Sequence, residues 1–293
     1  MKTIDRDLHA DFRVVTSPLR VSPDFVIVGE AKCGTTSMFQ YIGRHSDVFP
    51  ALKKEPRNFI EYPDSLAQCR RHYPTMIRKA LHLAVGGSRF VAGEATAEYF
   101  ANRQVPGVLS RLLPEVKIII MLRHPSARAL SDYQMFNNRG LVDESFEEIA
   151  DRSIQWLSND DVYPWLLDAG QCEHSTIRFV LRGIYAESAE RWLKHFPKEQ
   201  LLFICSEDFF SETAEIAKRI FRFLGLDDHH VENLGVMRKG VYERETYSSV
   251  LEKLDRFYDA HNEKLYALLG QDFGWNDAGN QPAAADRGEY DCY

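Results

Sequence analysis

Short, continuous apolar runs alternate along the chain with segments of helical spacing. Four runs are candidate strands, at residues 24–28, 90–92, 117–122 and 201–205. Runs that are apolar at nearly every position are typical of parallel strands, because helices cover both faces of such a sheet. Helices are predicted at about 35–43, from Pro125 onward, and at about 184–195, 212–224 and 248–269. This alternation predicts an α/β fold with a central parallel sheet flanked by helices.

No linker rich in Pro, Gly or Ser and no internal repeat divides the chain, so we expect one domain over residues 21–276. Residues 1–20 form an N-terminal extension, and residues 277–293, rich in Ala, Gly, Asp and Asn, are expected to be a flexible tail. Residues 139–180 have weak periodicity and many polar positions. They predict a helical insertion near the mouth of a site or, equally well, a plain surface excursion.

The stretch Phe25–Ser37 joins a buried strand to a helix through a Gly-rich loop. Such a junction presents backbone N–H groups and the positive end of a helix to a phosphate. Gly29 and Gly34 keep the glycine spacing of nucleoside-triphosphate loops, but Thr35 stands where those loops have Lys. The lysine is Lys32, inside the loop. The sequence predicts a phosphate-bearing ligand in a P-loop-like three-layer fold, and disfavours ATP held with magnesium.

A cation follows the run at 117–122, at the point where magnesium-dependent P-loop proteins often carry an acidic residue. That cation is Arg123, whose guanidinium can bind two phosphate oxygens at once. Ser131 follows, on the helix that begins at Pro125, and can add a hydroxyl donor. Because ligands of open α/β sheets bind beyond the carboxyl ends of the strands, the Gly-rich loop and Arg123 are expected at one edge. A second phosphate would then be held by protein charge, with no metal.

Two further charged clusters are candidates for the site. Lys53–Phe59 holds Glu55 among cations, which is either a surface ion pair or a general base. Met237–Gly240 is either a solvated basic turn or a further phosphate contact. The local charges alone do not choose between these readings. The alternative bases are His45, His124 and His174; histidines of this kind are more often structural, and His174 is the best of the three because it falls in the insertion.

The net charge of −7 and the pI near 5.8 argue against a nucleic-acid partner and, less strongly, against a long polyanionic acceptor. The five cysteines are odd in number and lack metal-ligand spacing, which favours reduced cytoplasmic thiols. Cys33 is interpreted as a small space-filling residue of the loop. No signal peptide and no run long enough to span a bilayer is present, so we expect a cytoplasmic protein without a membrane partner. Homo-oligomerisation is left open.

Taken together, these segments resemble the sulfotransferases that use 3′-phosphoadenosine-5′-phosphosulfate (PAPS), over about residues 24–275. The resemblance is to the carbohydrate branch, such as the heparan sulfate 3-O- and N-sulfotransferases. The matching segments are Lys32–Ser37 for the 5′-phosphosulfate, Lys54–Pro56 for the catalytic carboxylate, Gly93–Phe100, Leu122–Tyr133 for the 3′-phosphate, and Arg238–Gly240 for a late basic loop. Ala95 and Arg57 depart from that branch, which usually has Lys at the first position and often His at the second. Both departures weigh against a heparan-like acceptor.

The resemblance implies transfer of a sulfuryl group from PAPS to a hydroxyl or amine of a small acceptor such as a natural product. Adenosine 3′,5′-bisphosphate is the product, and no metal is required. The implied donor ligands are Lys32, Cys33, Gly34, Thr35, Thr36 and Ser37 on the 5′ side, and Arg123, Ser131, Arg238, Lys239 and Gly240 on the 3′ side. Glu55 is implied as the general base, Lys32 as the cation that stabilises the leaving phosphate, and His174 as an alternative base. The competing hypotheses are a P-loop kinase for a small metabolite and a non-catalytic module that binds the bisphosphate.

Overall fold

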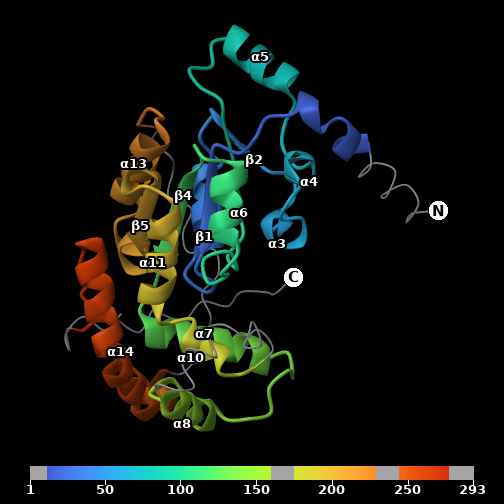
Figure 1. Ribbon diagram of the computed structural model, residues 1–293. Coiled ribbons are helices and arrows are strands. Elements are labelled where there is room, and N and C mark those ends of the chain that lie inside the picture. The colour runs from blue at the N-terminus through green and yellow to red at the C-terminus, as the bar shows by residue number, and fades with distance from the viewer. Residues whose placement is uncertain (1–11, 160–174, 229–243, 277–293) are drawn as a thin grey trace. The chain divides into compact units, whose positions relative to one another are not determined.

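The computed structural model describes residues 12–159, 175–228 and 244–276. Contacts within the chain divide it into two compact units, both drawn in Figure 1. The first unit comprises Met1–Leu122 and Arg191–Met237, and the second comprises Arg123–Glu190 and Arg238–Tyr293. Each unit has a hydrophobic core of its own. The expected single domain over residues 21–276 stays a prediction.

The first unit is built on a five-stranded, wholly parallel sheet with the strand order β2-β3-β1-β4-β5. The strands are β1 (Phe25–Gly29), β2 (Val48–Pro50), β3 (Val91–Ala95), β4 (Lys117–Leu122) and β5 (Leu201–Cys205). Helices flank this sheet, so the predicted P-loop-like α/β fold is confirmed. The edge strand β2 was not predicted, because three residues ending in Pro carry too little pattern.

The helices of the first unit precede, separate and follow these strands along the chain. They are η1 (Ser17–Leu19), α2 (Thr35–Ile42), α3 (Asn58–Glu61), α4 (Leu66–Arg70), α5 (Met76–Ala84), α6 (Val105–Leu112), η3 (Lys198–Gln200), α12 (Ser206–Ser211) and α13 (Thr213–Leu224). Ile27, Ile119 and Ile204, from three adjacent strands, pack in one core with α2 and α13. Their neighbours Val26 and Ile118 are equally buried, as alternation across a two-sided sheet requires. Figure 1 shows α6 in front of β1.

The second unit is helical. Its elements are α7 (Pro125–Asn137), α8 (Phe146–Leu157), α10 (Arg178–Leu181), η4 (Arg244–Tyr247) and α14 (Ser248–Leu269), and α11 (Tyr185–His195) has residues in both units. A buried ion pair joins Arg128 to Asp132, with Nη1 to Oδ2 at 3.1 Å, and Arg128 Nη2 also donates to the carbonyl of Phe179. Tyr258 Oη donates to the carbonyl of Val180 at 2.7 Å. These buried polar contacts connect α7, α10 and α14.

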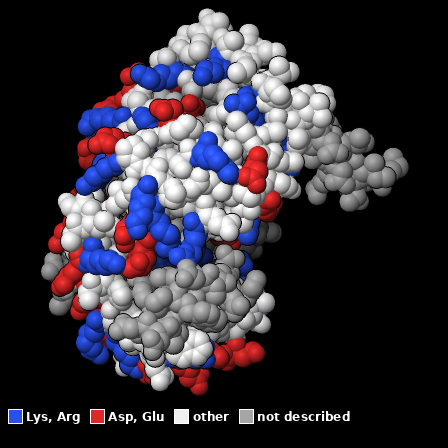
Figure 2. Space-filling model, in the orientation of Figure 1, with Lys and Arg blue, Asp and Glu red and all other residues white. Residues whose placement is uncertain are grey.

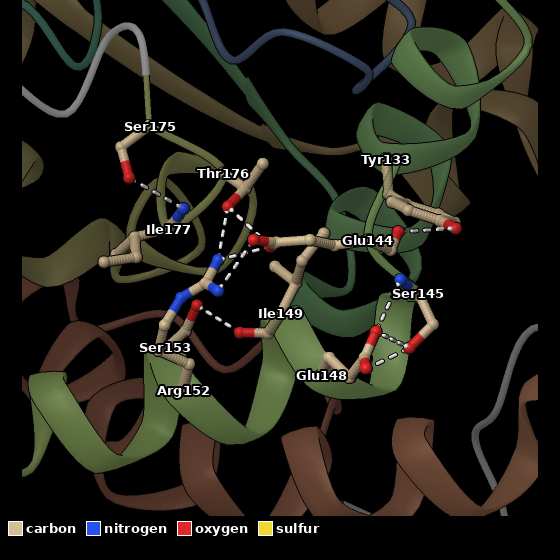
Figure 3. Close-up of polar contacts among 10 residues, drawn as sticks. All are labelled: Tyr133, Glu144, Ser145, Glu148, Ile149, Arg152, Ser153, Ser175, Thr176 and Ile177. Carbon is tan, nitrogen blue, oxygen red and sulfur yellow. Dashed lines mark hydrogen bonds and ion pairs between the residues drawn. The ribbon is translucent and has the colours of Figure 1, made fainter. Parts of the chain in front are cut away.

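Helix α8 lies inside the predicted helical insertion at 139–180 and begins at a capping box. Ser145 Oγ accepts from the N–H of Glu148 at 3.3 Å, and Glu148 Oε2 accepts from the N–H of Ser145 at 2.9 Å (Figure 3). Arg152 donates to both carboxylate oxygens of Glu144, at 2.9 and 2.5 Å, and to Thr176 Oγ1 at 2.6 Å. One guanidinium therefore connects α8 to the residues that precede α10. Residues 160–174 of the insertion lie outside the described part.

Candidate active site

The Gly-rich loop follows β1 and leads into α2, as the sequence predicts. Gly29 has φ 150°, and a Cβ there would lie 2.7 Å from Phe100 Cβ, so only glycine fits. Glu30 is fully buried; its N–H donates to Met121 O at 2.7 Å, and its Oε1 accepts from the N–H of Ala31 at 2.6 Å. The loop is thereby fixed against β4. The buried carboxylate at its base was not singled out from the sequence.

The loop ends in an uncapped helix N-terminus. Gly34 is the N-cap of α2 with φ 90°, and no side chain caps the helix there. The first N–H groups of any α-helix lack partners within the helix, so those of Thr35, Thr36 and Ser37 face the position that an anion would take. Thr36 is half-buried. Hydroxyls, amides and a helix dipole here form a set of donors that suits an anionic sulfate or phosphate group.

Lys32 and Cys33 complete the loop. Lys32 adopts φ 70°, a left-handed conformation that non-glycine residues rarely take, and is half-buried. Cys33 is fully buried, its Sγ lies 3.8 Å from Ala31 O, and its carbonyl accepts from Ser206 Oγ at 2.8 Å. These contacts agree with the interpretation of Cys33 as a space-filling residue.

Glu55 lies beside this loop, in the same unit. Lys54 Nζ donates to Thr36 Oγ1 at 2.6 Å and lies 3.5 Å from Glu55 Oε1. The N–H of Glu55 donates to Ala95 O, at the carboxyl end of β3, at 3.1 Å. The Glu55 side chain is 49% exposed, so it remains open to an acceptor. One lysine therefore connects the candidate base to a hydroxyl of the candidate donor loop.

The sequence alone does not indicate a role for Lys54. It belongs to the charged cluster Lys53–Phe59, but its partner Thr36 is 18 residues earlier. No spacing rule connects two such positions. Lys54 follows β2 and Thr36 follows β1, and β3 lies between these two strands in the sheet, so the contact depends on the strand order β2-β3-β1.

Arg57 is held by carboxylates. Its Nη1 lies 2.7 Å from Glu98 Oε2 and its Nε lies 3.7 Å from Glu61 Oε1. Both Glu55 and Arg57 have positive φ values, 51° and 56°. Such conformations are uncommon outside glycine and cluster at functional sites. The positive charge of Arg57 is therefore balanced by two carboxylates of this chain, Glu98 and Glu61.

A buried carboxylate lies under the same edge of the sheet. Glu94, on β3, is fully buried, and burial raises its pKa from 4.5 to about 8, although the hydroxyls of Thr96 and Tyr99 act in the opposite direction. Thr96 Oγ1 donates to Glu94 Oε2 at 2.9 Å. Within the described part of the chain, Glu94 Oε1, Tyr73 Oη and the side-chain amide of Asn58 are buried without hydrogen-bond partners. Ordered water commonly satisfies atoms of this kind.

Arg123 and Ser131 belong to the second unit. Arg123 directly follows β4 in the sequence, is half-buried, and accepts at its carbonyl a hydrogen bond of 2.7 Å from Tyr185 Oη. Ser131 is half-buried on α7, about two turns from its start. Both residues are where the sequence predicted them, after a strand and on the following helix. Their role in holding the 3′-phosphate stays a prediction.

Two of the three candidate histidines have structural partners. The Nδ1 of His45 accepts from the N–H of Asp47 at 3.1 Å, its Nε2 lies 3.3 Å from Asp227 O, and its ring packs edge-on against Phe221. His124 is buried before α7, with Nδ1 3.8 Å from Asp255 Oδ1. His174 lies outside the described residues, as do Arg238, Lys239 and Gly240.

In the described ranges, no three His, Cys, Asp or Glu side chains are grouped so that they could hold a metal ion. None of the described helices is long and apolar enough to cross a membrane.

Comparison with known proteins identifies similar chains. The sulfotransferase domain family matches residues 22–265. Heparan sulfate glucosamine 3-O-sulfotransferase 3B1 of Mus musculus is 29% identical over 279 residues, which cover 87% of this chain and 65% of the mouse protein. The enzyme of the same name from Homo sapiens is 29% identical over 278 residues, with the same coverage. This chain thus spans less than two thirds of the length of these relatives.

A solved sulfotransferase from Alicyclobacillus acidocaldarius supports the fold. It superposes with a TM-score of 0.64 at 24% identity and covers 87% of this chain and 99% of that one.

Proposed function

Because this chain belongs to the sulfotransferase domain family, we propose that it transfers a sulfuryl group from PAPS to a hydroxyl or amine of an acceptor. The observation that carries the proposal is the contact of Lys54 with both Thr36 and Glu55. It brings a solvent-accessible carboxylate next to an uncapped, hydroxyl-rich helix N-terminus. General-base catalysis of group transfer needs a proton acceptor within reach of the reacting group, and Glu55 is a carboxylate in that position.

The donor set of the loop fits a phosphosulfate. The amides and hydroxyls of Thr35, Thr36 and Ser37 would hold its anionic oxygens, and Lys32 would supply the positive charge. Arg123 and Ser131 are the proposed ligands of the 3′-phosphate, together with Arg238, Lys239 and Gly240. When bound, PAPS supplies the sulfuryl group and a phosphate leaving group.

Glu55 would remove the proton from the acceptor oxygen or nitrogen as the new bond to sulfur forms. The Glu55 side chain is half exposed, so an acceptor can reach it. The backbone N–H of Glu55 donates to Ala95 O, which fixes its position. Lys32 would stabilise the negative charge that develops on the leaving phosphate. Positioning and charge stabilisation supply most of the rate in a transfer of this kind. His174 remains an alternative base.

We propose a small acceptor, such as a natural product, in place of a long polyanion. The supporting feature is the balance of charge around Glu55, since Arg57 is paired with Glu98 and Glu61. Ala95, where the heparan-type branch usually carries Lys, is buried and uncharged. The curated relatives carry heparan sulfate glucosamine in their names, so heparan oligosaccharides are the necessary comparison.

A transfer assay with radiolabelled PAPS tests the proposal on a panel of small alcohols, phenols and amines beside heparan oligosaccharides. Glu55→Gln should lower kcat by about 10²- to 10⁴-fold and leave binding of adenosine 3′,5′-bisphosphate unchanged in a thermal-shift titration. Glu61→Gln is the matched control, because it removes a nearby carboxylate that has no proposed catalytic role. A Glu55→Gln enzyme with a normal rate would remove Glu55 from the base role. Bisphosphate binding with no transfer to any acceptor would favour the non-catalytic module.

We also propose that the protein acts in the cytoplasm. The described cysteines Cys33, Cys69 and Cys205 are free thiols, and all three are buried. Free thiols are the usual state of cysteine in a reducing compartment.

A further inference from the structure

Helix α5 (Met76–Ala84) has its apolar side turned to solvent. None of its residues is buried, although it is strongly amphipathic. Figure 1 shows it at the end of the first unit, beyond the edge strand β2. An amphipathic helix on a globular protein normally packs its apolar stripe on the core. In α5 the polar side packs on the unit and the apolar side faces solvent.

The polar side of α5 faces the body. Arg78 Cζ lies 5.2 Å from the centroid of the Phe49 ring, on β2. His82 Nε2 lies 2.7 Å from Asp47 Oδ1, and the His82 ring packs edge-on against Phe49 at 4.9 Å. Asp47 is further held by Ser88, whose Oγ donates to Oδ2 at 2.6 Å. These contacts fix the orientation of the helix, so the outward apolar side is part of the folded unit.

The outward side carries large apolar residues. Met76 is 55% exposed, Ile77 70% and Leu81 61%, and Val85, the C-cap, is 82% exposed. With about 3.6 residues per turn Ile77, Leu81 and Val85 follow one another along one stripe of the helix, and Met76 lies about a quarter turn from Ile77. Contiguous apolar surface is uncommon on soluble monomers and marks interaction sites.

A second segment of the same unit extends this surface. Residues 12–19 expose Phe12, Val15 and Leu19 by 60% or more. This segment is joined to the start of α5, since Arg20 forms a bridge with Thr75 and the N–H of Val21 donates to Pro74 O at 3.0 Å. The apolar side chains of both segments therefore belong to one end of the unit, which we call the α5 surface.

The α5 surface is cationic, although the chain as a whole has a net charge of −7. No Asp or Glu occurs between Asp64 and Glu94, whereas that interval carries Arg70, Arg71, Arg78, Lys79 and Arg89. Arg13 adds to this charge from residues 12–19. Figure 2 shows white and blue atoms, and no red ones, over α5 at the top of the view.

Nearby positive charges also contribute to the lowered pKa of a neighbouring histidine, His72. The pKa of His72 is lowered to about 4, first by burial and then by repulsion from Arg71, Lys53 and Arg13. A neutral His72 is therefore expected near pH 7. No carboxylate between Asp64 and Glu94 balances the charge of the cations near His72.

We propose that the α5 surface docks on the anionic surface of a lipid bilayer. Exposed apolar side chains flanked by Lys and Arg are the combination that binds such surfaces, through apolar burial and attraction to anionic lipids together. A second copy of this chain fits less well, because a symmetric contact would bring the same cations face to face. A sulfated polysaccharide would use the cations but leave the apolar residues uncovered. The absence of a spanning run, noted in the sequence, does not bear on a helix that lies on the membrane.

Vesicle flotation tests this proposal with the full chain. Vesicles of phosphatidylcholine that contain phosphatidylglycerol should carry the protein upward, and vesicles of phosphatidylcholine alone should carry much less. The double variant Ile77→Glu, Leu81→Glu should bind the anionic vesicles at least about tenfold more weakly, and Lys79→Gln should bind them about fivefold more weakly. Leu141→Glu, at a residue that is 63% exposed in the other unit, is the matched control and should bind normally. Thermal melts would establish that each variant is folded.

Three results would overturn the proposal. The first is equal vesicle binding by the wild type and the Ile77→Glu, Leu81→Glu variant. The second is that light scattering finds a dimer for the wild type and a monomer for this variant, and that neither binds vesicles. The α5 surface would then be a contact with a second copy of the chain. The third is binding of heparin but not of anionic vesicles, which would give it to a polyanion.

Discussion

Replacing Glu94 by glutamine is expected to make the protein more stable at pH 8 than the wild type, and no more stable at pH 5. Glu94 is fully buried on β3, and Thr96 donates to only one of its oxygens. Burial disfavours the carboxylate form, which raises its pKa from 4.5 to about 8. A glutamine keeps the shape and the accepting oxygen, and cannot ionise.

The sign and the size follow from linkage. Between pH 4.5 and about 8 the folded chain keeps a proton on Glu94 that the unfolded chain has released. The free energy of unfolding of the wild type therefore falls as pH rises through this window, and levels off above it. One pKa unit corresponds to about 1.4 kcal/mol, so the shift sets an upper bound of about 5 kcal/mol on the loss.

Urea denaturation at a series of pH values, followed by tryptophan fluorescence, measures this difference. The curves of wild type and Glu94→Gln should converge near pH 5 and separate as the pH rises. Glu148→Gln is a control of opposite sign, since hydrogen bonds from Ser145 lower the pKa of Glu148 and its carboxylate form is the stabilising one. Parallel curves for wild type and Glu94→Gln across the whole range would refute the argument that Glu94 is protonated in the folded chain.

Three further substitutions test the site and its support. Lys54→Met should lower kcat by about tenfold or more and leave bisphosphate binding within a few-fold, as measured by initial rates beside the surface control Lys218→Met; a Km effect alone would contradict this. Gly34→Ala places a Cβ 2.8 Å from Phe210 Cζ at φ 90°, so it should cost about 1–2 kcal/mol of stability and weaken bisphosphate binding in calorimetry; unchanged binding would count against the loop. Ser145→Ala removes the cap of α8 and should cost about 1 kcal/mol, visible as a lower urea midpoint, whereas Ser145→Asp should restore it.

The strands that pattern alone predicts are those buried on both faces. β1, β4 and β5 are apolar at nearly every position, and their observed bounds agree with prediction within a residue. β3 was predicted only over residues 90–92, because Gly93 and Glu94 interrupt the apolar run. The strand continues through them because Gly93 and Glu94 pair with Phe25 and Val26 of β1, a contact that hydropathy does not contain.

Helix α5 was not among the helices predicted from the sequence. Its pattern is amphipathic, but its apolar side is exposed and its polar side carries the tertiary contacts. The predicted helix 212–224 is confirmed as α13, whereas the short helix α12, which follows β5 directly, was not predicted. Neither the exposed apolar side of α5 nor the helix α12 could be predicted from periodicity, because each depends on contacts with neighbouring segments.

Within the candidate site, local sequence predicted the Gly-rich loop as an anion site, and family resemblance pointed to Glu55; both roles stay predictions. The Gly-rich loop has a local signature, namely an apolar strand, two glycines and a helix start. The contact between Lys54 and Thr36 has none, because it depends on the pairing of β3 with both β2 and β1.

The central claim is that side-chain cations and helix amides, without a metal, hold a nucleotide with two separated phosphates. Isothermal calorimetry with adenosine 3′,5′-bisphosphate, in buffer that contains a chelator, tests it most directly. The account predicts tight binding that Lys32→Ala weakens by about tenfold or more, and no binding of ATP under the same conditions. Uptake of ATP only when magnesium is added, together with no binding of the bisphosphate, would contradict it.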